Sequence, residues 1–158
     1  MTSIKLIKDG IYNIWDYCYF KDDIGVAYTS VGQYMMFMKA VLFKDYPIAK
    51  LILNSPYPSQ QKRFGKLIEH YSSTVWLKHC RMIAFNGNYF KFSQNNNLKS
   101  QLMGTSGLLA LAKKSSSLWG IGLCKENPDA MNITKWKGFN WMGEDLTALR
   151  LLLESEKA

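Results

Sequence analysis

The sequence predicts a helix-rich α+β fold with a small β element, formed as a single domain over residues 1–158. Apolar residues recur at helical spacing in several segments, whereas aromatic and β-branched residues gather around turn signals near the N-terminus. A chain of 158 residues, 47% of them hydrophobic, is long enough for one core and too short for two comfortable ones. One helix-rich domain is therefore expected.

The first part of the chain predicts a β element followed by helices. Residues 10–29 are rich in Tyr, Trp, Phe and Ile and contain Gly25 as a turn signal, which indicates short strands or a hairpin. Apolar residues at helical spacing then predict a helix over 31–44. Pro47 can occupy the first turn of a second, short helix over 48–53.

The second part predicts more helices separated by polar breaks. Further helices are expected over 59–68 and over 144–154. Between them, the Ser and Thr residues at 72–74 are typical of an N-cap for a long helix. The side chains expected to face the core from that helix are Val75, Trp76, His79, Met82 and Ile83, with Phe90 as a further candidate. The asparagines at 95–97 break the chain, which is then loop-like between residue 115 and Trp136.

The charge balance predicts an anionic partner. The net charge is +8, which by itself does not distinguish a nucleic acid from a phosphorylated small molecule. Residues 70–125 contain no acidic residue, although solvated surfaces usually mix both signs. The basic residues of this acid-free stretch are Lys78, Arg81, Lys91, Lys99, Lys113, Lys114 and Lys125. A site for an anion is the favoured interpretation, and a basic surface that aids solubility is the alternative.

Several other classes of protein are not favoured by the sequence. No apolar run approaches the roughly 18 residues of a membrane span, and the first ten residues carry charges where a signal peptide is apolar. A cytoplasmic location is expected, in the host cytoplasm if the protein is viral. Cys18, Cys80 and Cys124 are widely separated and lack a metal-binding spacing with His70 or His79. Reduced thiols are expected, with no metal and no cofactor.

Several short segments carry a resemblance through their common order and spacing. They are residues 28–40 (YTSVGQYMMFMKA), 64–66 (FGK), Trp76, Arg81, 91–92 (KF), 119–122 (WGIG), Gly138, Asn140, Gly143, Leu146 and Arg150. Over residues 24–152 this order resembles the NADAR family, also known as the YbiA-like N-glycosidases. The resemblance implies a compact α+β domain that acts on the N-glycosidic bond of a phosphorylated or ADP-linked ribose. Such anionic ribosides agree with the acid-free stretch.

The departures from the family pattern concern its carboxylates. Breaking an N-glycosidic bond builds positive charge on the ribose C1′, which a carboxylate stabilises, directly or by activating water. In the resemblance, the family's Glu of the first helix corresponds to Gly32, and its later Glu to Leu111 or Ala112. A family Asp corresponds approximately to Ser116, and the family's S-N-F segment to residues 13–17, which read NIWDY.

The missing carboxylates favour a protein that is not an enzyme. Losing one acid–base group costs roughly 10² to 10⁴ in rate, so a site without any replacement would retain little activity. Glycine is also a poor helix former. Gly32 could therefore make room for a ligand bulkier than the family's substrate, or it could lie at the helix start, where glycine costs less.

Ten residues are predicted to bind the ligand, and none is predicted to be catalytic. They are Gly32, Gln33, Tyr34, Lys39, Lys66, Arg81, Trp119, Gly120, Gly122 and Asn140. An indole can stack on a base, glycines let backbone N–H groups approach phosphate, and cations pair with phosphate. Each has a structural alternative: a turn for the loop residues, a surface cation for Lys and Arg, and the core for Tyr34.

Three functions remain open from the sequence. The first is non-catalytic binding, or sequestration, of an ADP-ribose-like or cyclic ADP-ribose-type nucleotide, for example by a viral protein that removes a nucleotide immune signal from its host. The second is an active N-glycosidase that hydrolyses ADP-ribosyl-guanine or riboflavin-pathway ribosides with a relocated acid. The acids considered are Asp22, Asp23, Glu126, Asp129, Glu144 and Asp145. The third is a nucleic-acid module, for which no motif is present.

Overall fold

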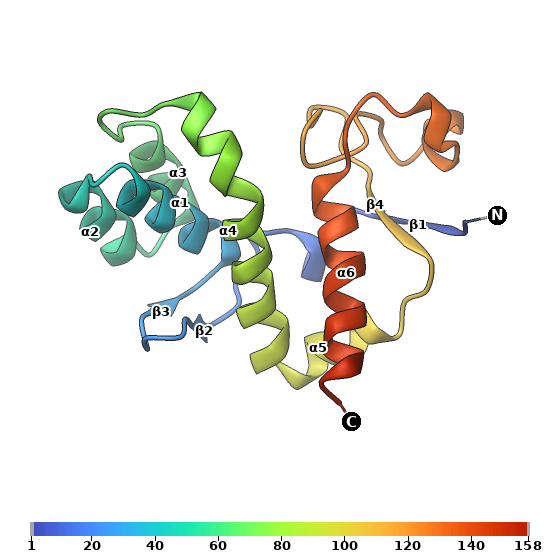
Figure 1. Ribbon diagram of the computed structural model, residues 1–158, viewed down its shortest axis with the longest axis horizontal. Coiled ribbons are helices and arrows are strands. Elements are labelled where there is room, and N and C mark those ends of the chain that lie inside the picture. The colour runs from blue at the N-terminus through green and yellow to red at the C-terminus, as the bar shows by residue number, and fades with distance from the viewer. Residues whose placement is uncertain (1, 158) are drawn as a thin grey trace. The chain divides into compact units, whose positions relative to one another are not determined.

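The computed structural model describes residues 2–157 and confirms a helix-rich α+β fold (Figure 1). The chain divides into two compact units. One, called the terminal unit below, consists of residues 1–13 and 96–158, and the other, the central unit, consists of residues 14–95. Each unit contains a two-stranded sheet and helices.

The central unit begins with the predicted hairpin. Strands β2 (Phe20–Lys21) and β3 (Ala27–Tyr28) pair antiparallel. The side chain of Asp22 closes the turn, because its Oδ1 accepts hydrogen bonds from the backbone N–H groups of Ile24 and Val26. Aspartate is favoured in such turns for this reason.

Helix α1 (Val31–Leu42) follows and confirms the first predicted helix. The hydroxyl of Ser30 caps it by accepting from the N–H of Gln33. Helices α2 (Tyr46–Asn54), α3 (Pro58–Gly65) and α4 (Ser73–Gln94) all pack against α1. Figure 1 shows α2 and α3 beside α1, and a buried cluster joins them. Its members are Ala40, Ala49, Ile52 and Ile68.

The buried face of α4 differs from the expected one. Val75, His79 and Met82 were expected to face the core and are exposed, whereas Ile83 is buried as predicted. The residues that α4 buries are Cys80, Ile83, Ala84, Gly87, Asn88, Lys91 and Phe92. This stripe contains a glycine, an amide and a cation, so the apolar pattern alone gives the wrong rotation of the helix.

The terminal unit is built on a parallel strand pair. Strand β1 (Ile4–Ile7) pairs with β4 (Leu108–Leu111), with Ile4 opposite Leu108. The sequence did not predict β1, because it spans four residues in a charged segment. Helix α6 (Trp141–Ser155) packs on β4, and α5 (Asn96–Met103) packs on α6 (Figure 1). The break predicted at 95–97 is limited to Asn95.

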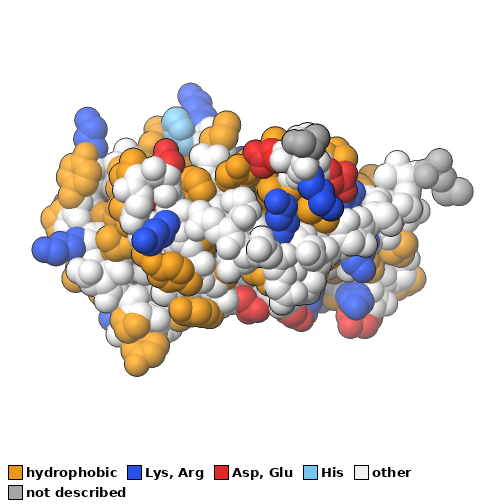
Figure 2. Space-filling model, turned by 90° about the horizontal axis from the view of Figure 1, so that it is seen from below, with side chains coloured by type: hydrophobic (Ala, Val, Ile, Leu, Met, Phe, Trp, Pro, Cys, Tyr) orange, Lys and Arg blue, Asp and Glu red, His pale blue; other side chains and the backbone are white. Residues whose placement is uncertain are grey.

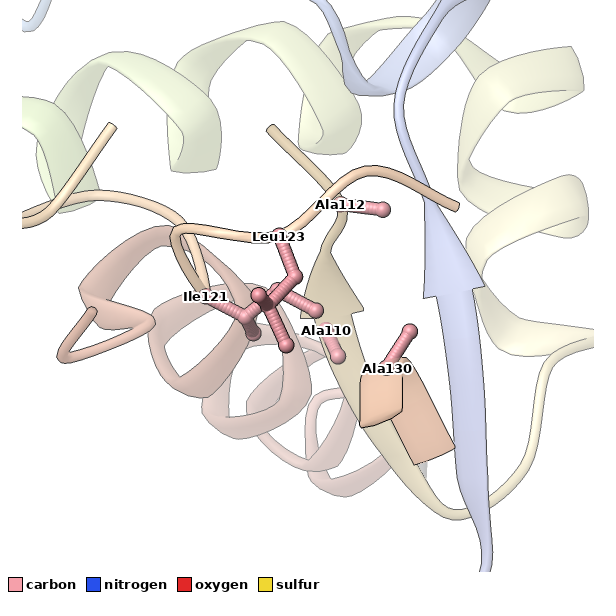
Figure 3. Close-up of a cluster of buried hydrophobic side chains, with 5 residues drawn as sticks. All are labelled: Ala110, Ala112, Ile121, Leu123 and Ala130. Atoms are coloured by element: carbon pink, nitrogen blue, oxygen red, sulfur yellow. The ribbon is translucent and has the colours of Figure 1, made fainter. Parts of the chain in front are cut away.

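A buried apolar cluster holds the loop after β4 onto the strand (Figure 3). Ile121 and Leu123 come from this loop, and Ala130 comes from the short helix η2 (Pro128–Met131). Two further 3-10 helices, η1 (Gly10–Tyr12) and η3 (Ile133–Lys135), complete the unit. Along residues 2–157, no helix is both long enough and apolar enough to span a membrane.

Candidate functional site

The ten predicted ligand-binding residues fall on both units. The central unit contains six of them, namely Gly32, Gln33, Tyr34, Lys39, Lys66 and Arg81. The terminal unit contains the other four, namely Trp119, Gly120, Gly122 and Asn140. Nine of them lie at the N-terminal end of α1, around Lys39, or in two loops before α6, and Arg81 lies on α4.

Gly32, the second residue of α1, lies directly against the indole of Trp15. A Cβ added to Gly32 would lie 2.6 Å from Cε2 of Trp15 and closer still to two other ring atoms. The backbone N–H of Gly32 also donates to the carbonyl of Ile14, at 2.8 Å. The space beside Gly32 is therefore filled by the protein itself rather than left open for a ligand.

A cation also lies close to the indole of Trp15. The ammonium of Lys62, on α3, lies 4.8 Å from the centroid of a Trp15 ring, which is within the range of a cation–π interaction. Trp15 is only partly buried, so its indole contributes to the surface of the central unit. Sequence reasoning left Trp15 without a role, although it lies in the segment that departs from the family's S-N-F pattern.

The buried side chain of Gln33 links α1 to Thr29, which precedes the helix cap, and to the end of α2. Its Oε1 accepts from the backbone N–H of Thr29 at 2.8 Å and from the Thr29 hydroxyl at 3.1 Å. Its Nε2 donates to the carbonyl of Ile52 at 3.1 Å, with the carbonyls of Leu53 and Ser55 close by. Because these bonds use both ends of the amide, they account for a buried glutamine at this position.

Tyr34 belongs to an aromatic cluster in the core of the central unit. Its ring packs edge-on against Tyr28, with centroids 5.1 Å apart, and against Phe90, at 5.9 Å. Burial, with a smaller contribution from Asp22 and Asp23, raises the pKa of Tyr34 to about 12. The structure thus supports the core interpretation of this residue.

Lys39 lies in an aromatic setting at the other end of α1. Its ammonium is 4.6 Å from the ring centroid of Tyr71 and 5.6 Å from that of Trp76, and it donates to the carbonyl of Gly65 at 3.1 Å. Burial lowers the pKa of Lys39. Lys66, which follows Gly65, is exposed at the end of α3. The structure therefore brings Lys39 and Lys66 to one place.

Two further cations of the central unit lie on α4. Arg81 is half-buried, whereas Lys91 is almost completely buried, with 1% of its surface exposed. Burial lowers the pKa of Lys91, and the nearby Cys18 and Asp16 oppose that shift. Sequence reasoning noted Lys91 only as a basic residue and as part of the KF match. A buried lysine is rare enough to mark a residue of interest.

In the terminal unit, Trp119, Gly120 and Gly122 lie in a loop that packs backbone against backbone. The N–H of Ile121 donates to the carbonyl of Leu111, and its carbonyl accepts from the N–H of Lys137. A Cβ on Gly120 would lie 2.8 Å from the carbonyl oxygen of Leu111, and Gly122 has a positive φ of 72°. Close packing and backbone conformation therefore explain both glycines.

Three aromatic side chains, from this loop, from the residues before α6 and from the start of α6, lie together. Trp119 meets Trp141 edge-on, with centroids 5.9 Å apart, and Trp141 lies 6.3 Å from Phe139. Phe139 is 68% exposed, and both tryptophans are half-buried. The group forms a partly exposed aromatic surface, of the kind on which a nucleobase can stack.

Asn140 connects this loop to the strand β4. Its Oδ1 accepts from the N–H of Leu111 at 2.9 Å, and its Nδ2 donates to the carbonyl of Leu109 at 3.0 Å. It adopts the left-handed conformation, with φ 55°, immediately before α6. The side chain is almost completely buried and pairs with the edge of β4 as a neighbouring strand would.

The other two positions to which the resemblance assigns carboxylates have different surroundings. Leu111 and Ala112 are buried, and Ala112 belongs to the apolar cluster beside β4. The hydroxyl of Ser116 accepts hydrogen bonds from the N–H groups of Trp119, at 3.1 Å, and Gly120, at 3.0 Å. Ser116 therefore provides an acceptor for two backbone donors, as a carboxylate in its place would.

The acid-free stretch is divided between the two units: residues 70–95 belong to the central unit and residues 96–125 to the terminal unit. Among its cations, Lys91 is buried, whereas Lys78, Lys113, Lys114 and Lys125 are exposed. On the face shown in Figure 2, Lys and Arg side chains stand singly or in small groups.

Comparison with known proteins identifies the family of the chain. The sequence model of the NADAR domain matches residues 10–154. The chain belongs to the NADAR domain family. The match begins earlier than the resemblance noted over 24–152 and so includes the segment around Trp15.

Two relatives support this assignment, and one solved structure has the same fold. The chain is 33% identical over 145 residues to "N-glycosidase R617" of Acanthamoeba polyphaga mimivirus, covering 89% of this chain and 85% of that protein. It is 32% identical over 128 residues to "Protein irg-1" of Caenorhabditis elegans, covering 79% of this chain and 60% of that protein. The NMR structure of the E. coli protein YbiA matches with a TM-score of 0.80 over 99% of this chain and 88% of that chain, at 21% identity. The YbiA match confirms the fold.

Proposed function

We propose that this chain binds an ADP-ribose-like nucleotide, linear or cyclic, and releases it uncleaved. The observation that carries the proposal is the contact between Gly32 and Trp15, at the position where the family resemblance places a glutamate. Because the indole fills the space beside Gly32, a carboxylate side chain could not be placed there without moving Trp15.

The surroundings of the other two replaced carboxylates also support binding without hydrolysis. Leu111 and Ala112 are part of a packed apolar region, where an ionised group would be costly without a partner. Ser116 keeps a hydrogen-bonding role but not a negative charge. A hydroxyl neither stabilises a cationic ribose as a carboxylate does nor serves as a comparable base.

Binding itself is supported by aromatic and basic groups in the predicted set. Within the terminal unit, the half-buried ring of Trp119, from the predicted set, suits a nucleobase, and the exposed ring of Phe139 belongs to the same aromatic group. Within the central unit, the predicted residues Lys66 and Arg81 are cations of the kind that pairs with phosphate. Sequestration of such a nucleotide, for example by a virus against a host signal, is the setting that we favour. That role requires the protein to hold the nucleotide without cleaving it.

Calorimetric titration with ADP-ribose and its cyclic isomers, followed by chromatography of the recovered ligand, tests the proposal. Binding with intact recovery is expected. Trp119→Ala should weaken binding, because base–aromatic stacking contributes about 1 to 3 kcal/mol per base. Tyr17→Ala is a matched control, since Tyr17 is 78% exposed and lies outside the predicted set. Absence of binding at millimolar ligand would overturn the proposal.

The mimivirus relative is described as an N-glycosidase, which keeps hydrolysis as the second candidate. Among the acids considered for it, Asp22 is already engaged: Oδ1 accepts from two backbone N–H groups and Oδ2 accepts from the Tyr28 hydroxyl at 3.0 Å. Incubation with DNA carrying ADP-ribosyl-guanine, and with riboflavin-pathway ribosides, separates the two functions. Release of the base that is lost in an Asp145→Asn or Glu144→Gln variant would favour hydrolysis over our proposal.

A further inference from the structure

The terminal unit contains a wide, solvent-open cavity of about 530 Å³ that none of the ten predicted residues lines. Its wall comes from β1, from η1 and the residue before it, and from the end of α5 and the two residues after it. The volume lies in the range of ordinary small-molecule sites, roughly 300 to 1,000 Å³. It is large enough for a phosphorylated monosaccharide.

The polar groups of the wall can recognise such a molecule. They include the ammonium of Lys5, the phenol of Tyr12 and the amide of Gln101, all of which can donate hydrogen bonds. The carboxylate of Asp9 can accept from a sugar hydroxyl. Donors and a cation, together with a single carboxylate, suit a ligand that carries a negative group and hydroxyl groups.

Behind this wall lies a buried cation. Arg150 of α6 is only 7% exposed, and its guanidinium donates to the hydroxyl of Thr105 at 2.9 Å and to the carbonyl of Gly107 at 2.6 Å. Both partners are neutral, and within residues 2–157 no carboxylate pairs with Arg150. Thr105 also lines the cavity, so the guanidinium is one side chain away from it.

The charge of Arg150 reaches the cavity. A buried charge without a counter-ion is screened less than an exposed one, so its field extends into adjacent space. Tyr12, which lines the cavity, responds to it: burial raises the pKa of Tyr12, and the Arg150 charge opposes that rise. The hydroxyl proton of Thr105 is donated to the carbonyl of Leu102, so Arg150 acts through its field rather than through this hydroxyl.

We propose that this cavity is a second binding site, for a phosphorylated sugar, in which Lys5 and Tyr12 contact the phosphate and Arg150 supplies positive potential from behind. Asp9 then accepts from the sugar hydroxyls. The site is independent of the nucleotide site proposed above, because it shares no residue with it.

The test is an NMR titration of the full-length chain with ribose 5-phosphate, with neutral ribose as the comparison ligand. Shifts are expected at the amides of Gly10, Gly104 and Thr105, and neutral ribose should produce much weaker ones. Lys5→Gln should weaken ribose 5-phosphate binding about tenfold, and Tyr12→Phe a few-fold, since charge-assisted hydrogen bonds are the stronger ones. Neither side chain is buried in the core, so both variants should fold.

Lys8→Gln is the matched control. Lys8 carries the same charge and follows β1, but it does not line the cavity. Equal weakening by Lys5→Gln and Lys8→Gln, or equal binding of ribose, would overturn the proposal. So would loss of ribose 5-phosphate binding in Trp119→Ala, because the phosphate would then be bound at the nucleotide site.

Discussion

The start of α1 and the loop before Trp119, where the family resemblance places carboxylates, differ in what surrounds the side chain. At Gly32 the indole of Trp15, from an earlier segment, occupies the space that a longer side chain would need. At Ser116 a shorter polar group keeps the hydrogen bonds to two backbone N–H donors. The first position is closed sterically by Trp15, whereas the second holds an uncharged acceptor.

This difference teaches that a missing acid has no single structural meaning. A replaced side chain can be compensated by a neighbour that fills its volume, or by a smaller group that meets the same donors. Only the first arrangement makes a carboxylate side chain difficult to accommodate. The two regions therefore make opposite predictions for the reintroduction of a carboxylate.

The largest effect is expected for Gly32→Glu. Overlap with Trp15 should reduce the free energy of unfolding by about 3 kcal/mol, as overpacking in a closely packed site does. Urea denaturation measures it. In the double variant Trp15→Gly/Gly32→Glu the overlap is relieved, and a coupling energy of about 2 kcal/mol between the two positions is expected. Full stability of Gly32→Glu alone would show that Trp15 moves aside easily.

A slightly smaller effect is expected for Asn140→Ala. This change removes the bonds to Leu109 and Leu111 and places alanine in the left-handed conformation, which should cost about 2 to 3 kcal/mol. Asn132→Ala is the control: Asn132 is an exposed asparagine that caps η3 and should cost about 1 kcal/mol. Equal losses in thermal denaturation would argue against a special role for Asn140.

The burial of Tyr34, two residues after Gly32, predicts a loss of stability at high pH. Because the folded-state pKa is about 12 and the ordinary value is 10.0, the folded protein retains the phenol proton longer than the unfolded chain. Stability from this group is present below pH 10 and is lost as the pH rises to about 12. Relative to Tyr34→Phe, the loss should be on the order of 2 kcal/mol. Parallel pH profiles for the two proteins would contradict it.

The smallest effects are expected at Ser116. Ser116→Ala removes the acceptor of two N–H groups and should cost about 1 kcal/mol, whereas Ser116→Asp restores an acceptor and should change stability by less than about 0.5 kcal/mol. Ser117→Ala is the control for loss of a hydroxyl in this loop. A destabilised Ser116→Asp would remove the contrast with Gly32, since both positions would then reject a carboxylate.

The sequence by itself determined the fold class, the family and most helices. Helical spacing after Ser30, the capping serines and the ordered short motifs are local signals, and local signals survive without knowledge of distant contacts. They also identified Gly32, Leu111, Ala112 and Ser116 as the positions that depart from the family pattern.

What only the tertiary structure decided depends on contacts between residues far apart in the chain. Strand β1 is four residues long and forms because β4, about a hundred residues later, pairs with it. The rotation of α4 follows from burying Lys91 and Asn88, which no apolar pattern marks. Above all, the role of Trp15 could not be read from its own segment. Whether an indole fills a space depends on which residue lies opposite, and here that residue is the glycine at position 32.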